Sequence, residues 1–78
     1  DQYLQIAALS SRESATELLA NVEEVIDEPV FINTMKDPAG KTLYRVRVGP
    51  IGDPAELENI SRKLVAADFG MPYPVRQE

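Results

Sequence analysis

The sequence predicts an α+β domain with the element order β-α-β-β-α-β. Residues 43–51 alternate between apolar and polar side chains and then stop at a Gly-Pro pair, which is typical of a strand that ends at a tight corner. Residues 10–13 and residues 53–56 each have the pattern of a helix N-terminus. A shift of 42 residues overlays the first half of the chain on the second, so that Leu4 falls on Val46 and Leu18 on Ile60. These observations make residues 1–78 a single domain, of a size that buries a small core.

The two alternating segments predict two strands with distinct faces. In residues 43–51, Tyr44, Val46 and Val48 share one face, and Leu43, Arg45 and Arg47 share the other. Residues 3–9 alternate in the same way. We expect the apolar row Leu4, Ile6 and Ala8 to face a core, and the opposite row to consist of Tyr3, Gln5, Ala7 and Leu9.

A helix is predicted after each of these strands. Ser10 and Glu13 have the spacing of a capping box, and the apolar stripe that follows extends to Ile26, before Asp-Glu-Pro stops the helix. Residues 53–56, Asp-Pro-Ala-Glu, supply an N-cap, a proline at the first helical position and an early glutamate. The buried stripe of this second helix is expected to be Leu57, Ile60 and Leu64.

The second helix and the remaining strands are delimited by glycine and proline. Gly70 is expected in the left-handed conformation that ends the second helix, with Met71 packing back on its last turn. Residues 30–36 are rich in β-branched and aromatic side chains, and the turn at residues 37–40 predicts a hairpin into residues 43–51. Residues 72–76 contain two prolines, so they are expected to form only a short edge strand.

The register of the hairpin decides which side chains meet. If Lys36 pairs with Thr42, then Val30 and Ile32 lie opposite Val48 and Val46 and face the core, whereas a slip of one residue would reverse both faces. We predict the first register. Right-handed crossovers then place both helices on one face of a four-stranded antiparallel sheet with the strand order 4-1-3-2.

The other face of this sheet has no helix to cover it. The predicted site consists of the side chains on that face: Tyr3, Gln5, Ala7, Phe31, Asn33, Met35, Leu43, Arg45 and Arg47. Aromatic, amide and guanidinium groups on one uncovered face indicate a binding surface. Each residue also has a simpler explanation, because arginines on a sheet face are usually solvated and aromatic rings can be covered by a neighbouring domain.

Composition argues against several functions. The formal net charge of −5 disfavours nucleic acid as the main ligand. There is no cysteine and no histidine, so a thiolate metal site and the commonest acid-base group are both missing. The acidic residues near the end of the first helix are interpreted as a solvated surface, and we expect no metal and no cofactor. The chain shows no membrane span and no leader, and it begins without methionine, so we expect it to be cut from a longer protein.

Residues 3–9 and residues 43–51, each followed by a helix, resemble the two halves of a SPOR domain, the sporulation-related repeat of bacterial cell-envelope proteins. The run Tyr-Arg-Val-Arg-Val-Gly-Pro at residues 44–50 is the most specific part of the match. The resemblance implies a periplasmic module that binds septal peptidoglycan, prefers glycan strands stripped of stem peptides, and carries its parent protein to the division site. Gln5 occupies the family's glutamine position. Parent proteins of this kind include the rare lipoprotein A family of lytic transglycosylases.

Three other functions are weighed against this prediction. An RNA-recognition module has the same ferredoxin-like arrangement, but it would carry aromatic residues where Arg45 and Arg47 stand, and it would seldom be acidic. An enzyme would need a base beside Ser10 or Ser11, and the sequence places none there. A protein-interaction module that uses the same face without any glycan stays open. We therefore expect a non-catalytic, monomeric binding domain that neither binds nucleic acid nor inserts into a membrane.

Overall fold

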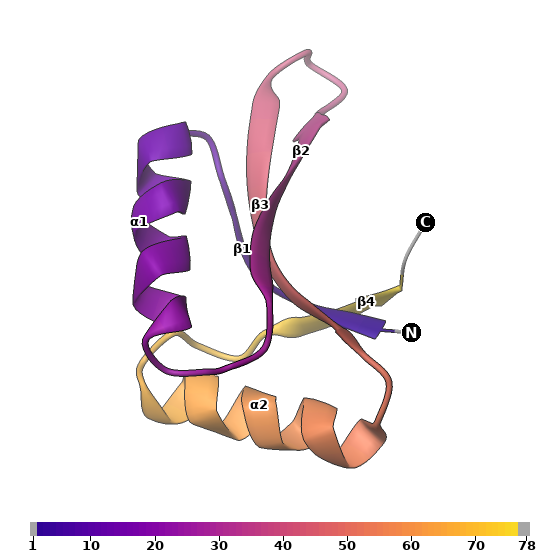
Figure 1. Cartoon of the computed structure of the whole chain (residues 1–78). Coiled ribbons are helices and arrows are strands. Elements are labelled where there is room, and N and C mark those ends of the chain that lie inside the picture. The colour runs from indigo at the N-terminus through magenta and orange to yellow at the C-terminus, as the bar shows by residue number, and fades with distance from the viewer. Residues whose placement is uncertain (1, 77–78) are drawn as a thin grey trace.

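The structure is a computed structural model that describes residues 2–76. Its elements follow the predicted order: β1 (Gln2–Leu9), α1 (Arg12–Glu23), β2 (Val30–Lys36), β3 (Thr42–Ile51), α2 (Pro54–Ala66) and β4 (Tyr73–Arg76). The strands form one antiparallel sheet in the order β2-β3-β1-β4, which is the predicted order read from the opposite edge. Figure 1 shows α1 running alongside the sheet and α2 crossing beneath it. Within residues 2–76, neither helix is long and apolar enough to span a membrane.

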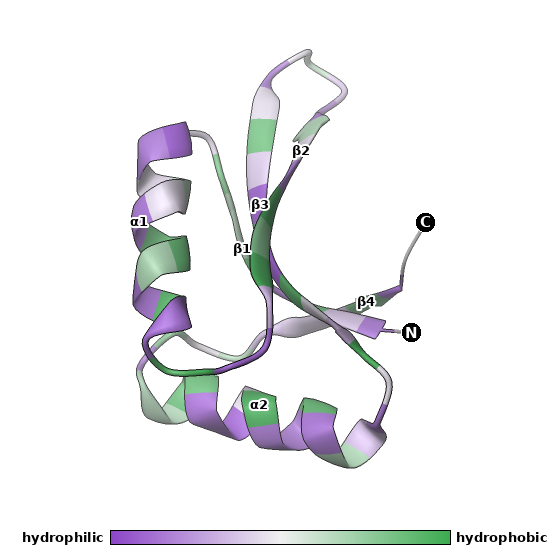
Figure 2. Cartoon of the chain, in the orientation of Figure 1, coloured by the Kyte–Doolittle hydropathy of each residue, from purple (hydrophilic) through white to green (hydrophobic). Residues whose placement is uncertain are grey.

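The core lies between the two helices and the apolar row of the central strands. Its buried members are Leu4, Val22, Ile26, Val48, Ile51, Ile60 and Leu64. In Figure 2 the hydrophobic residues of α2 lie mainly on the side of the helix that is turned toward the sheet. The stripe predicted for α2 is therefore confirmed at Ile60 and Leu64, which are both fully buried, and Leu57 packs against the cluster.

The hairpin register is confirmed. Lys36 pairs with Thr42, Ile32 with Val46, and Val30 with Val48. The loop between the strands is closed by Asp37, whose Oδ1 accepts hydrogen bonds from the backbone N–H groups of Ala39 and Lys41. This Asp-centred turn holds the pairing that keeps Val30 and Ile32 on the core side of the sheet.

Strand β1 contains a bulge that the alternation did not predict. Gln5 pairs with Arg47, but the next paired residue, Ala7, lies opposite Val46, and Ala8 lies opposite Arg45. Directly opposed residues of an antiparallel pair share a face, so the bulge turns Ala7 toward the helices and Ala8 away from them. The prediction that Ala7 lies on the uncovered face is therefore wrong, and Ala8 takes that place.

The start and the end of α1 are each displaced from the prediction. Ser11, not Ser10, is the N-cap, because Ser11 has an extended backbone and its hydroxyl accepts a hydrogen bond from the N–H of Ser14 at 3.2 Å. The predicted capping box between Ser10 and Glu13 is wrong. The helix ends at Glu23, before the predicted Ile26, although Ile26 is still buried in the core through the turn that follows.

The start of α2 is confirmed, but its end differs from the prediction. Asp53 caps the helix by accepting a hydrogen bond from the N–H of Ala55 at 2.9 Å. Gly70 has the predicted left-handed φ, +81°, but the left-handed position next to the helix is occupied by Asp68. The N–H of Phe69 donates to the carbonyl of Leu64. Phe69 packs on the core and closes the cap, as the residue after the left-handed position does in a Schellman motif. Met71 is 72% exposed and does not close it.

A pair of carboxyl groups links α2 to the segment before β2. The hydrogen bond from Glu56 to Glu28 raises the pKa of Glu56 above its ordinary value, helped by desolvation and by the charge of Glu28, while Lys63 lowers it and Asp53 adds to the rise. Within residues 2–76, Glu28 Oε1 is a buried oxygen that has no hydrogen-bond partner of its own. A carboxyl group with a raised pKa stabilises the fold below its unfolded pKa and loses that contribution as the pH rises through the folded value.

Replacing Glu56 with glutamine is therefore expected to remove a pH-dependent loss of stability, because the amide keeps a donor for Glu28 at every pH. The melting temperatures of the variant and the unmodified domain should agree near pH 3, and that of the variant should become the higher of the two as the pH rises to 7. Glu17→Gln on the exposed surface of α1 is the control. If the difference in melting temperature between Glu56→Gln and the unmodified domain does not change with pH, the raised pKa of Glu56 is contradicted.

Candidate functional site

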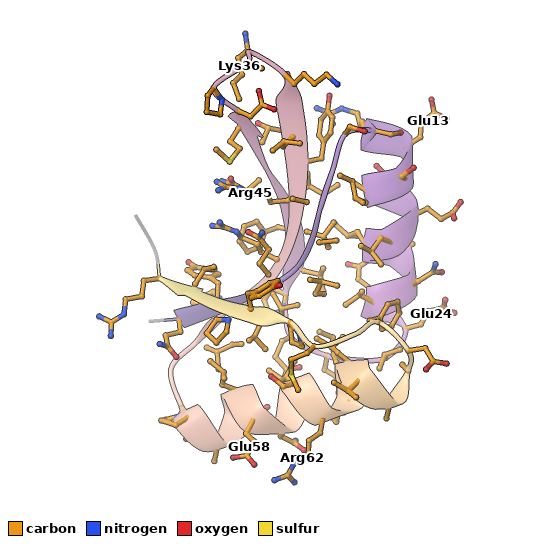
Figure 3. The ribbon with its side chains drawn as sticks, turned by 180° about the vertical axis from the view of Figure 1, so that it is seen from behind. Glu13, Glu24, Lys36, Arg45, Glu58 and Arg62 are labelled. Atoms are coloured by element: carbon orange, nitrogen blue, oxygen red, sulfur yellow. The ribbon has the colours of Figure 1, made fainter. Side chains whose placement is uncertain are left out.

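The candidate site is the face of the sheet that no helix covers, here called the open face. The pairings in the sheet place eight of the nine predicted residues on it: Tyr3, Gln5, Phe31, Asn33, Met35, Leu43, Arg45 and Arg47. Figure 3 shows Arg45 on the side of β3 away from α1. Ala7 is the exception, for the reason given above.

Two aromatic rings contact one another across the central strand of the open face. Tyr3 on β1 and Phe31 on β2 have ring centroids 5.6 Å apart and ring planes at 83°, so one ring presents its edge to the other. Such pairs are stabilised by about 0.5–1.5 kcal/mol beyond the area that they bury. Between their strands lies Gly49, where a β-carbon would come within 2.8 Å of Tyr3 Cδ2. The absent side chain of Gly49 lets the Tyr3 ring lie close to the β3 backbone.

Two arginine–amide pairs lie beside the rings. Arg47 Nε donates to Gln5 Oε1 at 3.0 Å, and Arg45 Nε donates to Asn33 Oδ1 at 3.0 Å. Arg45 Nη2 also donates to the same Asn33 oxygen. The pairs join β3 to β1 on one side and to β2 on the other. They therefore fix the side chains of all three strands relative to one another.

The two arginines differ in how far they can be reached. Arg47 is only 8% exposed, whereas Arg45 is partly buried and retains more accessible surface. The prediction placed both in the binding surface without distinguishing them. The structure instead makes Arg47 a largely covered side chain that holds Gln5, and it leaves Arg45 as the more accessible guanidinium of the pair.

Two further residues of the open face, both on β4, were not predicted. Tyr73 on β4 lies opposite Gln5 and is 69% exposed, and Val75 lies opposite Tyr3. The open face therefore extends across all four strands. The alternation of Tyr73 and Val75 with prolines was the available signal, but it was used only to identify an edge strand.

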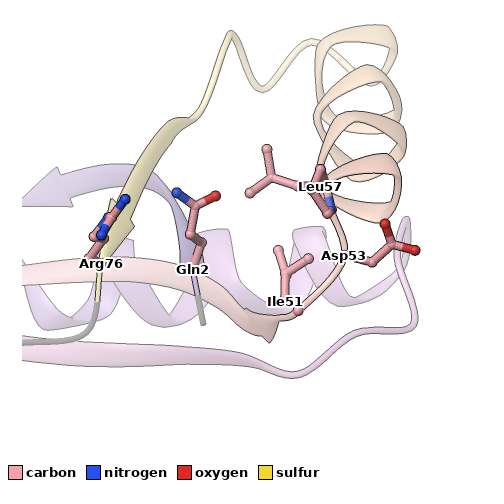
Figure 4. Close-up of a pocket in the computed structure, with 7 residues that line it drawn as sticks. Gln2, Ile51, Asp53, Leu57 and Arg76 are labelled. Atoms are coloured by element: carbon pink, nitrogen blue, oxygen red, sulfur yellow. The ribbon is translucent and has the colours of Figure 1, made fainter.

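A hollow of the described surface lies away from the open face. A pocket of about 680 Å³ lies beside the start of α2, lined by residues that include Gln2, Ile51, Asp53, Leu57 and Arg76 (Figure 4). It contains no predicted site residue, and its carboxylate, Asp53, caps the helix. Within residues 2–76 there is no group of three acidic side chains close enough to hold a metal ion.

The fold and the open face define a small α+β module that presents a flat, polar-aromatic sheet surface. The SPOR domain family model matches residues 2–74, and the chain belongs to this family. The chain is similar to the endolytic peptidoglycan transglycosylase RlpA of two Pseudomonas aeruginosa strains, with 34% identity over 76 residues in each case. That alignment covers 97% of this chain but 22% of each relative, so the chain spans about a fifth of their length.

A solved structure shares the fold. The crystal structure of the RlpA SPOR domain from Pseudomonas aeruginosa superposes with a TM-score of 0.93 and 34% identity, covering 99% of this chain and 100% of that one. The predicted fold class and the predicted family are therefore both confirmed.

Proposed function

We propose that this domain is a non-catalytic module that binds peptidoglycan glycan strands stripped of their stem peptides and carries its parent protein to the division septum in the cell envelope. The observation that carries the proposal is the composition of the open face: an aromatic pair stands beside an accessible guanidinium, and none of the residues from 2 to 76 that form this face is acidic. Family membership and relatives described as peptidoglycan transglycosylases support the choice of ligand.

The chemistry of a stripped strand fits this face. Each muramic sugar of such a strand carries a free lactyl carboxylate, whereas in an intact strand that group is an amide to the stem peptide. The flat apolar side of a sugar ring can pack on Phe31, and a guanidinium can pair with a carboxylate.

The direct test is binding of the isolated 78-residue domain to purified glycan strands with and without their stem peptides. We expect binding to the stripped strands, a monomer by size-exclusion chromatography and no release of glycan fragments. Exported fluorescent fusions of the domain should collect at septa. Equal or stronger binding to single-stranded RNA at physiological salt would favour the nucleic-acid alternative, and cleavage of strands by the domain alone would contradict the non-catalytic assignment.

Replacing Phe31 with alanine is expected to weaken binding to stripped strands about tenfold, because the substitution removes the surface on which a sugar ring would pack. The domain should stay folded, since Phe31 lies outside the core cluster, and its stability should fall only by the aromatic pair contribution of about 1 kcal/mol.

Calorimetric titration and thermal melting measure the two effects. Met71→Ala is the control, because it removes an exposed apolar side chain that follows α2 and lies outside the open face. Tyr73→Ala tests whether β4 belongs to the binding surface, and it should weaken binding without a loss of stability. Unfolding of Phe31→Ala would place Phe31 in the core and contradict its role in binding.

A further inference from the structure

We infer that Arg45 and Arg47 orient the two amides of the open face so that Gln5 and Asn33 present N–H donors to a ligand. The ligand they select then carries acceptor oxygens at the sugar nitrogen position, as an N-acetylated strand does and an N-deacetylated strand does not. This inference rests on the proposed function and adds a specificity to it.

The orientation follows from what a guanidinium can do. Arginine has N–H donors and no acceptor, so the amide atom that meets it must be the oxygen. Arg47 Nε meets Gln5 Oε1, and both Nε and Nη2 of Arg45 meet Asn33 Oδ1. Because the oxygen of each amide faces its arginine, the NH2 group of the amide is directed away from that arginine. Among residues 2–76, no hydrogen bond is found for Gln5 Nε2 or Asn33 Nδ2.

The arrangement is rigid because each pair links two strands. Gln5 lies directly opposite Arg47, and Asn33 lies directly opposite Arg45, so each hydrogen bond joins cross-strand neighbours on one face. Arg47 is 8% exposed and acts as a positioning residue for Gln5. An amide turned to offer its oxygen would lose the bond to its arginine and place N–H groups against a cation.

The polarity of the face therefore restricts the ligand. The open face offers amide and guanidinium donors, and it has no carboxylate within residues 2–76. An N-acetyl group supplies a carbonyl acceptor, and a lactyl group supplies a carboxylate. Removal of the acetyl group leaves an ammonium, which has donors only, and which would meet donors and positive charge. Deacetylation should therefore weaken binding even though the strand becomes smaller.

Gln5→Glu and Asn33→Asp test the inference because each replaces an NH2 donor with an acceptor of the same shape. Each carboxylate still pairs with its arginine, so both variants should melt at or above the temperature of the unmodified domain. The unmodified domain should bind stripped strands roughly tenfold more tightly than the same strands after chemical N-deacetylation. Each variant should lose about three- to tenfold in affinity for the acetylated strands and little or none for the deacetylated ones.

Asn59→Asp on the exposed surface of α2 adds the same charge away from the open face and should leave both affinities unchanged. If Gln5→Glu and Asn33→Asp bind acetylated strands as tightly as the unmodified domain does, the amides do not donate to the ligand and the inference is wrong. Exchange of the arginine Nε–H protons, measured by NMR in the free domain, tests the orientation without any ligand. Protons of Arg45 and Arg47 that exchange as fast as that of the exposed Arg62 would also overturn the inference. Failure of the unmodified domain to bind any strand would instead overturn the proposed function.

Discussion

A Gly49→Ala variant is expected to lose a large part of the stability of the domain. Gly49 has a φ of +140°, which side chains other than glycine rarely adopt, and an added β-carbon would lie 2.8 Å from Tyr3 Cδ2 and 3.2 Å from the backbone oxygen of Gln2. The backbone cannot easily move away, because the Gly49 N–H donates to the Pro29 carbonyl at 3.0 Å. Backbone strain and overpacking each cost about 1–3 kcal/mol, so we expect a loss of about 2–6 kcal/mol.

Urea denaturation of Gly49→Ala and Gly40→Ala separates the two causes of this loss. Gly40 also has a positive φ, +85°, but nothing lies within 4 Å of the position of its added β-carbon. Gly40→Ala should therefore report backbone strain alone and cost about 1 kcal/mol. A Gly49→Ala variant as stable as Gly40→Ala would show that Tyr3 moves aside freely and is not held against the β3 backbone.

Part of the sheet could be predicted from the sequence and part could not. The hairpin register followed from two features that both appear in the sequence: the Asp-Pro-Ala-Gly turn and the row of Val30 and Ile32 that had to meet the core. The bulge in β1 left no such mark. Ile6, Ala7 and Ala8 are all apolar, so either face could accept them, and the alternation did not show where an extra residue was inserted.

The internal repeat held a signal for the bulge. The pairing of β1 with β3 is irregular at two places: between Gln5 and Ala7 on β1, and near Gly49 and Pro50 on β3. The shift of 42 residues superposes Ala7 on Gly49. The irregular pairing at Gly49 and Pro50 therefore has an equivalent at Ala7 and Ala8, although neither of these is a glycine or a proline. The repeat thus indicates that the alternation of β1 is interrupted before Ala8, which places Ala8 on the open face.

The residues of the site were predictable as a set, but their hydrogen bonds were not. Alternation and register together placed Gln5, Asn33, Arg45 and Arg47 on one face, and the structure agrees. Which amide each arginine would hold depends on the offset between strands at the bulge and on side-chain rotamers, which residue spacing does not specify. The burial of Arg47 follows from these contacts. Spacing alone made the two arginines look equivalent.

The accessible arginine leads to the second large expected effect, on recognition of the lactyl carboxylate. Arg45→Met should weaken binding to stripped strands about tenfold or more, because a hydrogen bond to a charged group contributes about 1.5–3 kcal/mol. Binding to chitin oligomers, which have N-acetyl groups but no lactyl carboxylate, should change much less. The ratio of the two affinities is the quantity to measure, since loss of the Arg45 contact to Asn33 would weaken both ligands alike.

Two further variants and a salt series complete this test. Arg47→Met should lower stability more than it changes the ratio, because that side chain is almost fully covered and holds Gln5. Arg62→Met on the surface of α2, where the arginine pairs only with Glu58 among the described residues, should change neither quantity appreciably. Raising the salt concentration should weaken binding of the unmodified domain to stripped strands and should have little effect on Arg45→Met, because screening acts on the charge that the substitution removes. If the ratio of affinities in Arg45→Met equals that of the unmodified domain, the preference for stripped strands arises from steric exclusion of the stem peptide, and Arg45 serves only to orient Asn33.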